Sequence, residues 1–230
     1  FNSAKKKTSS IVYTWFNGAW ANSTKETWEF NGPSAKQTLH EKYSWSNNAW
    51  LITLQENLGY DAAGNNTSIE NYSYTNGVQK GTKKEEYTFN TAKKKINTYK
   101  YKWLTDAWVY STWAVTDFNS AGNKTEVANY TWKDNGWVGS GARTLWNYTT
   151  TPKTTEEITQ LWSNDIAEWA NAVKSITTYS GSKTIQTASY KWQDEEWLGT
   201  SRNDYHYNAA GLNDTIKTYT NTDTEWIYSN

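Results

Sequence analysis

The chain contains no cysteine, no methionine, two prolines and few aliphatic residues. Without cysteine it has no disulfide, no thiol nucleophile and no cysteine-ligated zinc. The absence of methionine indicates that the start of the natural chain lies outside this sequence, so we expect a slice of a longer protein. Leu, Ile, Val and Phe number only 31 of the 230 residues, but aromatic residues make up 17%. Aromatic side chains can replace an aliphatic core, since each buries about 150–250 Å².

Neither sign of charge is in excess, because 23 basic residues balance 23 acidic residues. This balance argues against a nucleic-acid partner, since such proteins carry a basic patch. No segment has the pattern of a signal peptide, and no apolar run approaches the roughly 18 residues of a membrane span. We therefore expect no direct membrane insertion.

The sequence instead repeats one motif about every 29 residues, and three aromatic series carry this period. The first series is Trp15, Trp45, Tyr74, Trp103, Trp132, Trp162 and Trp192. The second is Trp20, Trp50, Val78, Trp108, Trp137, Trp169, Trp197 and Trp226. The third is Phe30, Tyr60, Phe89, Phe118, Tyr148, Tyr179 and Tyr207. They predict a single array over residues 1–230, with repeats one to eight at approximately 1–30, 31–60, 61–89, 90–118, 119–148, 149–179, 180–207 and 208–230.

Each repeat has two runs rich in Thr, Tyr and Trp, separated by turn residues, which is typical of a β-hairpin. Asn17–Gly18, Asn76–Gly77 and Asn135–Gly136 predict the turn within a repeat, because both residues tolerate a positive φ. Between repeats, stretches such as Asp61–Gly64 have the signature of a type I turn. No window has a helical period, so the predicted fold class is all-β, a meander of tandem antiparallel β-hairpins.

Side chains alternate across a strand, so Tyr13 and Trp15 share one face. A two-residue turn would place Trp15 directly opposite Trp20. By the same alternation, Trp50, Ile52, Leu54, Leu58 and Tyr60 share one face. The pattern predicts one aromatic face and one polar face.

The spacings 78–89 and 137–148 are one residue longer than elsewhere, which predicts a bulge or a shifted turn in these two repeats. A flat meander of this length would expose a large aromatic surface. We therefore expect a long curled or spiral meander with an aromatic inner face.

The stretches "YDAAGNNTSIENYSY" (60–74) and "DFNSAGNKTEVANYTWKDNGWVGS" (117–140) resemble a repeat common in secreted and surface proteins of Bacteroidetes. The array is similar in style to the YD repeats of RHS-type proteins, whose hairpins wind into a hollow shell. The resemblance implies a secreted or cell-surface location and type 9 secretion. The partners it implies are other parts of the same surface protein, secretion-system or outer-membrane components, or glycans.

No catalytic motif or metal-ligand spacing occurs, and the two histidines, His40 and His206, lie 166 residues apart. We therefore expect no enzyme, no cofactor and no metal. The stretch "WKDNGW" also resembles tryptophan- and glycine-bearing cell-wall-binding repeats. Asp214, Thr215 and Ile216 resemble an O-glycosylation motif of the Bacteroidetes, which marks Thr215 as a candidate glycosylation site.

Three functions stay open. The first is a non-enzymatic structural or adhesive repeat segment of a large secreted or cell-surface bacterial protein. The second is a carbohydrate-binding module, because tryptophan faces stack on sugars. Its candidate residues are the tryptophans that flank the turns, Trp20, Trp50, Trp108, Trp137 and Trp197. The third is a shell segment of an RHS-like protein that encloses a toxin or other cargo.

Overall fold

The computed structural model describes residues 1–31, 36–222 and 225–229, and every regular element within them is a β-strand. The chain divides into an N-terminal half, Phe1–Trp113, and a C-terminal half, Ala114–Asn230. The first eight strands are β1 (Ser9–Phe16), β2 (Ala19–Asn31), β3 (Lys36–Ser46), β4 (Ala49–Tyr60), β5 (Asn66–Thr75), β6 (Val78–Phe89), β7 (Lys95–Leu104) and β8 (Ala107–Phe118). The other nine are β9 (Lys124–Lys133), β10 (Gly136–Gly139), β11 (Ala142–Thr150), β12 (Lys153–Ser163), β13 (Glu168–Ser180), β14 (Lys183–Gln193), β15 (Glu196–Tyr207), β16 (Asn213–Asn221) and β17 (Trp226–Ser229).

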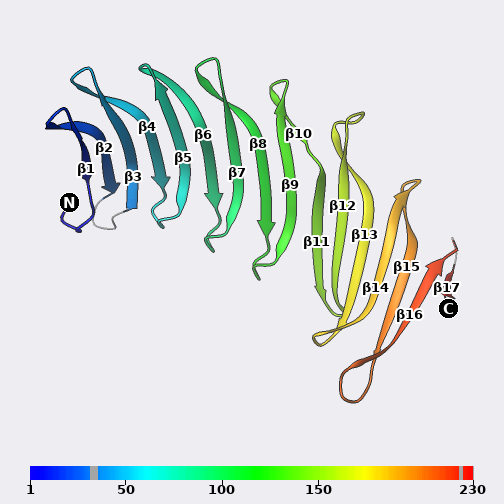
Figure 1. The fold of residues 1–230 in the computed structure, drawn as a ribbon. Coiled ribbons are helices and arrows are strands. Elements are labelled where there is room, and N and C mark those ends of the chain that lie inside the picture. Colours follow the sequence, from blue (N-terminus) through cyan, green and yellow to red (C-terminus); the bar gives the residue numbers. More distant parts are fainter. Residues whose placement is uncertain (32–35, 223–224, 230) are drawn as a thin grey trace. The chain divides into compact units, whose positions relative to one another are not determined.

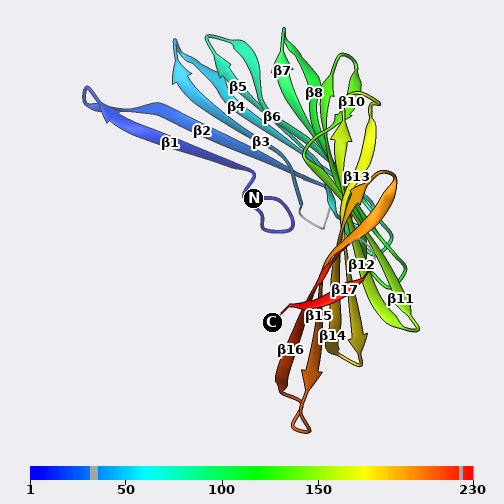
Figure 2. The same ribbon diagram turned by 90° about the vertical axis from the view of Figure 1, so that its right-hand side faces the viewer.

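Within each half, strands that follow one another along the chain lie side by side in one layer (Figures 1 and 2). The pairing is antiparallel from β1 to β7 and again from β9 to β17. The predicted all-β fold of tandem hairpins is confirmed. No helix able to cross a membrane occurs among the residues that the structure describes.

Two-residue turns close most hairpins, as the register of the tryptophans requires, whereas the sixth hairpin has four residues, 164–167, between the paired Ser163 and Glu168. Trp15 pairs with Trp20, which leaves Asn17 and Gly18 in the turn with φ of 47° and 79°. In the fifth repeat Trp132 pairs with Trp137, so the turn residues are Asp134 and Asn135. The turn predicted at Asn135–Gly136 is therefore wrong by one residue, because the tryptophan register places Gly136 at the start of β10.

Several turns between repeats follow the predicted pattern, whereas Thr150 pairs with Lys153 and Ser180 with Lys183 across two-residue turns. The amide of Gly64 donates to the carbonyl oxygen of Asp61 over 2.9 Å, and the Asp61 carboxylate accepts from the amide of Asn65 over 2.8 Å. The same two bonds recur at Asn119 and at Asn208. An Asx side chain at the first position thus holds each of these turns. The turn that follows Asn31 lies outside the described residues.

The second strand of a hairpin contains one extra residue, although the spacing of the sequence predicted a bulge in only two repeats. In β4 the extra residue is Thr53, because Tyr43 pairs with Ile52 while Lys42 pairs with Leu54. The equivalent residues elsewhere are Ser23, Thr82, Ala172 and Thr200. The bulge is therefore a regular part of the repeat.

The two repeats with longer spacing have different explanations. In the third repeat Tyr74 pairs with Gln79, so Gln79 holds the second tryptophan position and Val78 lies one residue before it. In the fifth repeat the irregularity is real. Tyr130 pairs with Gly139 but Val127 with Thr144, so three steps on β9 face five on the partner, and the partner is divided into β10 and β11.

The bulge switches the alternation of side chains, and this overturns the prediction of one aromatic and one polar face. Trp50 and Ile52 lie on the face of Trp45, but Leu54, Leu58 and Tyr60 lie on the other face. We call the side that carries the tryptophan pairs the Trp face and the other side the opposite face. The third aromatic series lies on the opposite face, near the turns between repeats. There Trp28 stacks on His40, with ring centroids 5.1 Å apart.

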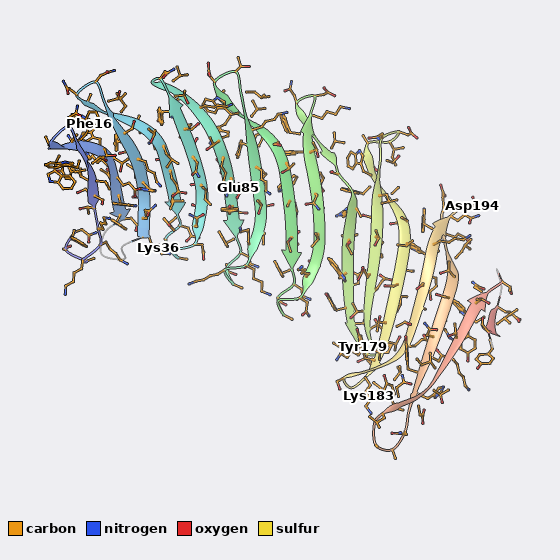
Figure 3. All side chains as sticks on the ribbon, in the orientation of Figure 1. Phe16, Lys36, Glu85, Tyr179, Lys183 and Asp194 are labelled. Carbon is orange, nitrogen blue, oxygen red and sulfur yellow. The ribbon has the colours of Figure 1, made fainter. Side chains whose placement is uncertain are left out.

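No second layer covers the Trp face within either half, as far as the described residues extend. Among them the buried hydrophobic ones are Ala128 and Ala188, and no large side chain is fully buried. The face predicted to be inner is therefore half-exposed. Figure 3 shows Phe16 and Asp194 at hairpin tips, and Lys36, Tyr179 and Lys183 at the ends where repeats join.

Neighbouring repeats pack where one of them has a glycine. A Cβ atom at Gly139 would lie 2.6 Å from Trp162 Cδ2 and 2.7 Å from Trp169 Cζ2, the tryptophan pair of the next repeat. Gly81 lies in the same way beneath Trp108, and Gly199 beneath Trp226. Glycine at this position lets a tryptophan ring approach the backbone of the preceding repeat.

Gly139→Ala tests this packing. The added methyl group overlaps two indole rings, so we expect the free energy of unfolding to fall by about 1–3 kcal/mol. Gly136→Ala is the matched control, since its new Cβ would meet no atom nearer than 3.8 Å. We expect that control to change the free energy of unfolding by less than about 0.5 kcal/mol. Urea denaturation followed by tryptophan fluorescence measures both, and equal losses would contradict this account.

Candidate functional site: the tryptophan pairs at the hairpin tips

Two tryptophans face each other across most hairpin turns. The ring centroids lie 4.9–5.4 Å apart and the rings meet edge to face, at interplanar angles of 66–83°. The pairs are Trp15–Trp20, Trp45–Trp50, Trp103–Trp108, Trp132–Trp137, Trp162–Trp169 and Trp192–Trp197. This geometry suits the quadrupoles of the rings, which favour an edge against a face.

The second tryptophan of a pair also contacts the repeat before it. Trp108 lies 5.9 Å from Tyr72, and its indole Nε1 donates a hydrogen bond of 3.1 Å to the Tyr72 hydroxyl. In the C-terminal half, Trp169 donates in the same way to Tyr130 over 3.3 Å. These indoles are fixed on both sides, which favours a packing role for them.

The candidate glycan-stacking residues differ in how much ring they expose. Trp20 is 68% exposed, whereas Trp50, Trp108, Trp137 and Trp197 are half-buried. Each stands at the tip of a different hairpin, so the structure does not gather them into one site.

Trp197 has a further neighbour, since the Lys174 ammonium lies 4.8 Å from its ring centroid. The same ammonium lies 4.9 Å from the ring of Tyr190. The lysine thus occupies a position over Trp197 that a stacked sugar would need.

Trp20 is the most open of the five candidates. It lines a shallow hollow of about 470 Å³ together with Tyr13. Its one ring partner in the described part of the chain is Trp15, which is itself 57% exposed. The hollow has an aromatic wall and little polar surface, which suits an apolar or stacking contact.

Tyrosine hydroxyls beside the tryptophans donate to glutamates. Tyr72 donates to Glu70 Oε1 over 2.5 Å, and burial together with this carboxylate raises the pKa of Tyr72. On the opposite face Tyr87 donates to Glu85, and burial with the same kind of bond raises the pKa of Tyr87 to about 12. Both phenols therefore remain protonated at neutral pH, and each donates its proton to a glutamate carboxylate of the same strand.

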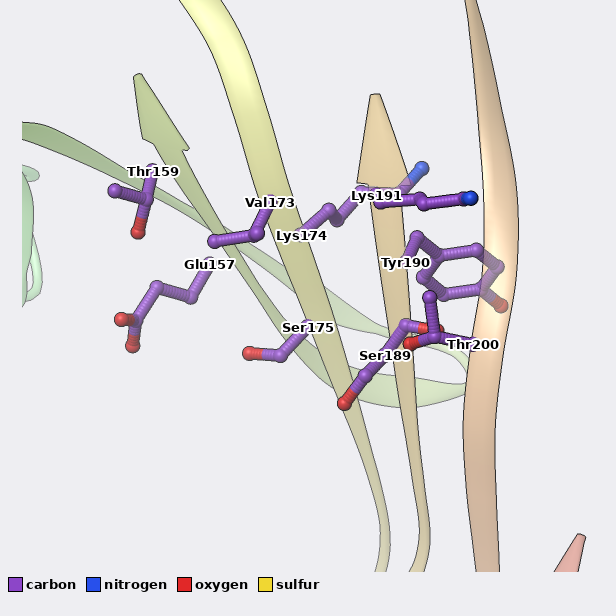
Figure 4. Close-up of a pocket in the computed structure, with 9 residues that line it drawn as sticks. All are labelled: Glu157, Thr159, Val173, Lys174, Ser175, Ser189, Tyr190, Lys191 and Thr200. Carbon is purple, nitrogen blue, oxygen red and sulfur yellow. The ribbon is translucent and has the colours of Figure 1, made fainter. Parts of the chain in front are cut away.

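A polar hollow of about 310 Å³ lies on the C-terminal half, and no sequence pattern pointed to it (Figure 4). Its walls come from β12 to β15. Glu157, Thr159, Ser175, Ser189 and Lys191 point to the opposite face by their register. Most of these side chains thus lie on the side of the sheet away from the tryptophan pairs, whereas Lys174 and Tyr190, which also line the hollow, point to the Trp face.

Thr215, the candidate glycosylation residue, is exposed in β16 and pairs with His206 of β15. The other histidine, His40, places Nε2 3.3 Å from Glu26 Oε2. No cluster of three or more metal-ligating side chains occurs among the described residues.

The packing glycines at 81, 139 and 199 were not among the predicted functional residues, although a signal was present. Gly139 and Gly199 follow a tryptophan by two residues, in "WVGS" and "WLGT". The lysines that link repeats were not predicted either. Lys153 Nζ donates to the carbonyl oxygen of Gly181 over 3.1 Å, and Lys36 donates to that of Gly64.

No family model and no curated protein matches the chain. Among solved structures, a protein of unknown function from Bacteroides fragilis NCTC 9343 is similar over 65% of this chain and 90% of its own, with 15% identity and a TM-score of 0.30. The structure of TcdB2-TccC3-TEV is similar over 92% of this chain, with 12% identity and a TM-score of 0.34, and this chain spans 13% of it. Both similarities concern the fold alone.

Proposed function

We propose that this chain is a non-enzymatic structural and adhesive repeat segment of a large secreted or cell-surface bacterial protein. The observation that carries the proposal is the recurrence of the same contacts at fixed sequence separations. The hydroxyls of Thr53, Thr82 and Thr200 each donate to a carbonyl eleven residues earlier on the neighbouring strand. Lys36 and Lys153 each donate a hydrogen bond to the carbonyl oxygen of a glycine 28 residues later in the chain, Gly64 and Gly181.

These contacts join adjacent strands, or adjacent repeats, and none brings distant parts of the chain to one centre. Stability of this kind is a sum over repeats and their interfaces, so the number of repeats can change without loss of the fold. Such an array suits a spacer or a display surface. The half-exposed tryptophan pairs supply an apolar surface for adhesion.

Deleting one repeat tests the structural part of the proposal. Removal of residues 149–179 would place Trp192 and Trp197 over Gly139, which already accommodates such a pair. We expect this variant to unfold cooperatively, with a urea m-value lower by about one-seventh, because m follows the surface exposed on unfolding.

Removal of residues 61–89 is the matched comparison. It would place Trp103 and Trp108 over Ile52, which holds the glycine position in the second repeat. We expect this variant to be less stable than the first deletion. Loss of the fold in both variants would contradict a modular array.

The proposed location predicts that antibodies against the chain label intact cells of the bacterium that produces it. A cytoplasmic protein of the same cells is the control, and it should be labelled after permeabilisation alone. Labelling of the chain that requires permeabilisation would reject a surface or secreted location.

Carbohydrate binding is the second candidate, and the exposed Trp20 beside Tyr13 favours it. A glycan array should then show binding that Trp20→Ala weakens at least tenfold, which corresponds to about 1.4 kcal/mol. Phe16→Ala is the control, because Phe16 is 67% exposed on the opposite face of the same hairpin. Equal binding by both variants and the unaltered chain would exclude a stacking role for Trp20.

A further inference from the structure

The junction between the fifth and sixth repeats departs from the rest of the array in three ways. The partner of β9 is divided into β10 and β11, and the hairpin of the sixth repeat has a four-residue turn, 164–167. Between these two features, Gln160 takes the place of a tyrosine. The tyrosines at the equivalent position are Tyr13, Tyr43, Tyr72, Tyr101, Tyr130, Tyr190 and Tyr219. Departures from a regular pattern that gather in one place mark a candidate functional site.

These departures surround one hollow on the Trp face, which we call the junction hollow. Its volume is about 310 Å³, and it is lined by Tyr130, Arg143, Trp162, Ala167, Glu168 and Trp169. The rings of Trp162 and Trp169 stand at 83° to each other, so they form two walls nearly at a right angle. The hydrogen bond from Trp169 to Tyr130 holds one of these walls in place. The volume is at the lower end of the range for small-molecule sites, about 300–1,000 Å³.

At other junctions a cation fills the equivalent space. It lies over the tyrosine with which it pairs, 4.4–5.1 Å from the ring centroid. These contacts are Lys25 over Tyr43, Lys84 over Tyr101, Lys174 over Tyr190 and Arg202 over Tyr219. Lys174 also lies over Trp197, and Arg202 over Trp226. A tryptophan ring in such a place is therefore already covered.

Arg143 holds the same position in the fifth repeat but has no such ring to lie over. It pairs with Gln160, and no cation lies over the tryptophan pair of the sixth repeat among the residues that the structure describes. Arg143 instead forms a bidentate ion pair with Glu126, over 2.9 and 3.0 Å, and donates to Gln160 Oε1 over 3.3 Å. The guanidinium is thus fixed in the lining of the hollow, and the tryptophan walls stay uncovered.

The side chains of the junction hollow suit a neutral sugar. Indole walls stack on the apolar face of a sugar ring, and a guanidinium donates to its hydroxyl groups. Arg143 has five N–H donors, of which Glu126 and Gln160 engage three, so that two remain. Glu126 neutralises the charge of the guanidinium, which weakens the attraction of an anion, and the guanidinium repels a cation.

We propose that the junction hollow binds one unit of a neutral polysaccharide. A sugar ring stacks on the tryptophan pair of the sixth repeat, and one of its hydroxyl groups accepts a hydrogen bond from Arg143. The site rests on the second candidate function, carbohydrate binding, and none of the five tryptophans predicted to stack on sugars lines it. It lies wholly within the C-terminal half, and repeats of the chain flank it on both sides.

Affinity electrophoresis of the whole chain tests the proposal, in native gels cast with starch, xyloglucan or galactomannan. A gel cast with pectate, which is anionic, is run beside them. The test uses a chain with Trp20→Ala, so that the other candidate contact is absent. We expect at least one neutral polysaccharide to retard this chain more than pectate does. Gln160→Tyr should then raise the dissociation constant at least tenfold, because Arg143 gains a ring to lie over, as Arg202 does, and covers the hollow.

Gln79→Tyr is the matched control, because it adds the same ring to the Trp face of the third repeat. It should leave the retardation unchanged. A second variant replaces the turn residues 164–167 with Asn–Gly, the turn of the third repeat, and removes Ala167 from the lining of the hollow. We expect it to weaken binding as Gln160→Tyr does. Urea denaturation identifies the variants that are folded.

Unchanged affinity in a folded Gln160→Tyr chain or a folded turn variant overturns the proposed site. Loss of all binding on Trp20→Ala also overturns it, and carbohydrate binding then stands at Trp20 alone. Retardation by pectate alone overturns the neutral ligand. If no polysaccharide retards the unaltered chain, carbohydrate binding itself fails, and the site fails with it.

Discussion

The edge-to-face tryptophan pair across the hairpin turn fixes the register of most repeats. Such a pair contributes about 0.5–1.5 kcal/mol beyond the area that it buries. This gain offsets unfavourable turn residues, since Thr105 and Glu195 adopt φ of 49° and 64° beside the pairs of their hairpins. In the third repeat Gln79 replaces the second tryptophan and donates a hydrogen bond of 3.0 Å to Tyr74, and there the turn is Asn76–Gly77. The same Asn–Gly turn stands beside the Trp15–Trp20 pair in the first repeat.

The bulge in the second strand of the hairpin divides most repeats into two zones. Toward the hairpin tip the aromatic side chains lie on the Trp face, and toward the next repeat they lie on the opposite face. Thr53, Thr82 and Thr200 occupy the bulge, and their hydroxyls bond the neighbouring strand where an extra residue disturbs the ladder. Both faces therefore have aromatic contacts, and neither becomes a uniformly polar surface.

The repeat period and the turn residues could be predicted from the sequence, whereas the face of the sheet on which each side chain lies could not. The series of Trp15 and Trp20 predicted the hairpins and the opposition of the two rings, because turn length alone determines that register. One extra residue in the second strand of a hairpin leaves no mark in composition, yet it moves Leu54 and Tyr60 to the other face. Val78 was matched to the tryptophans as an apolar residue, although pairing selects Gln79. The polar hollow is lined by residues of four strands, β12 to β15, which no local pattern of the sequence brings together.

Because each half of the sheet is a single layer, the side chains of a repeat are buried mainly by the repeats beside it. These contacts follow one direction along the chain. Trp108, Trp169 and Trp226 each lie over a glycine of the preceding repeat. Within each half, a tryptophan pair thus packs on the repeat that precedes it in the chain. A tyrosine such as Tyr72 or Tyr130 is covered by the repeat that follows it. The two ends of such an array are unequal, since one end exposes a tryptophan pair and the other exposes tyrosines.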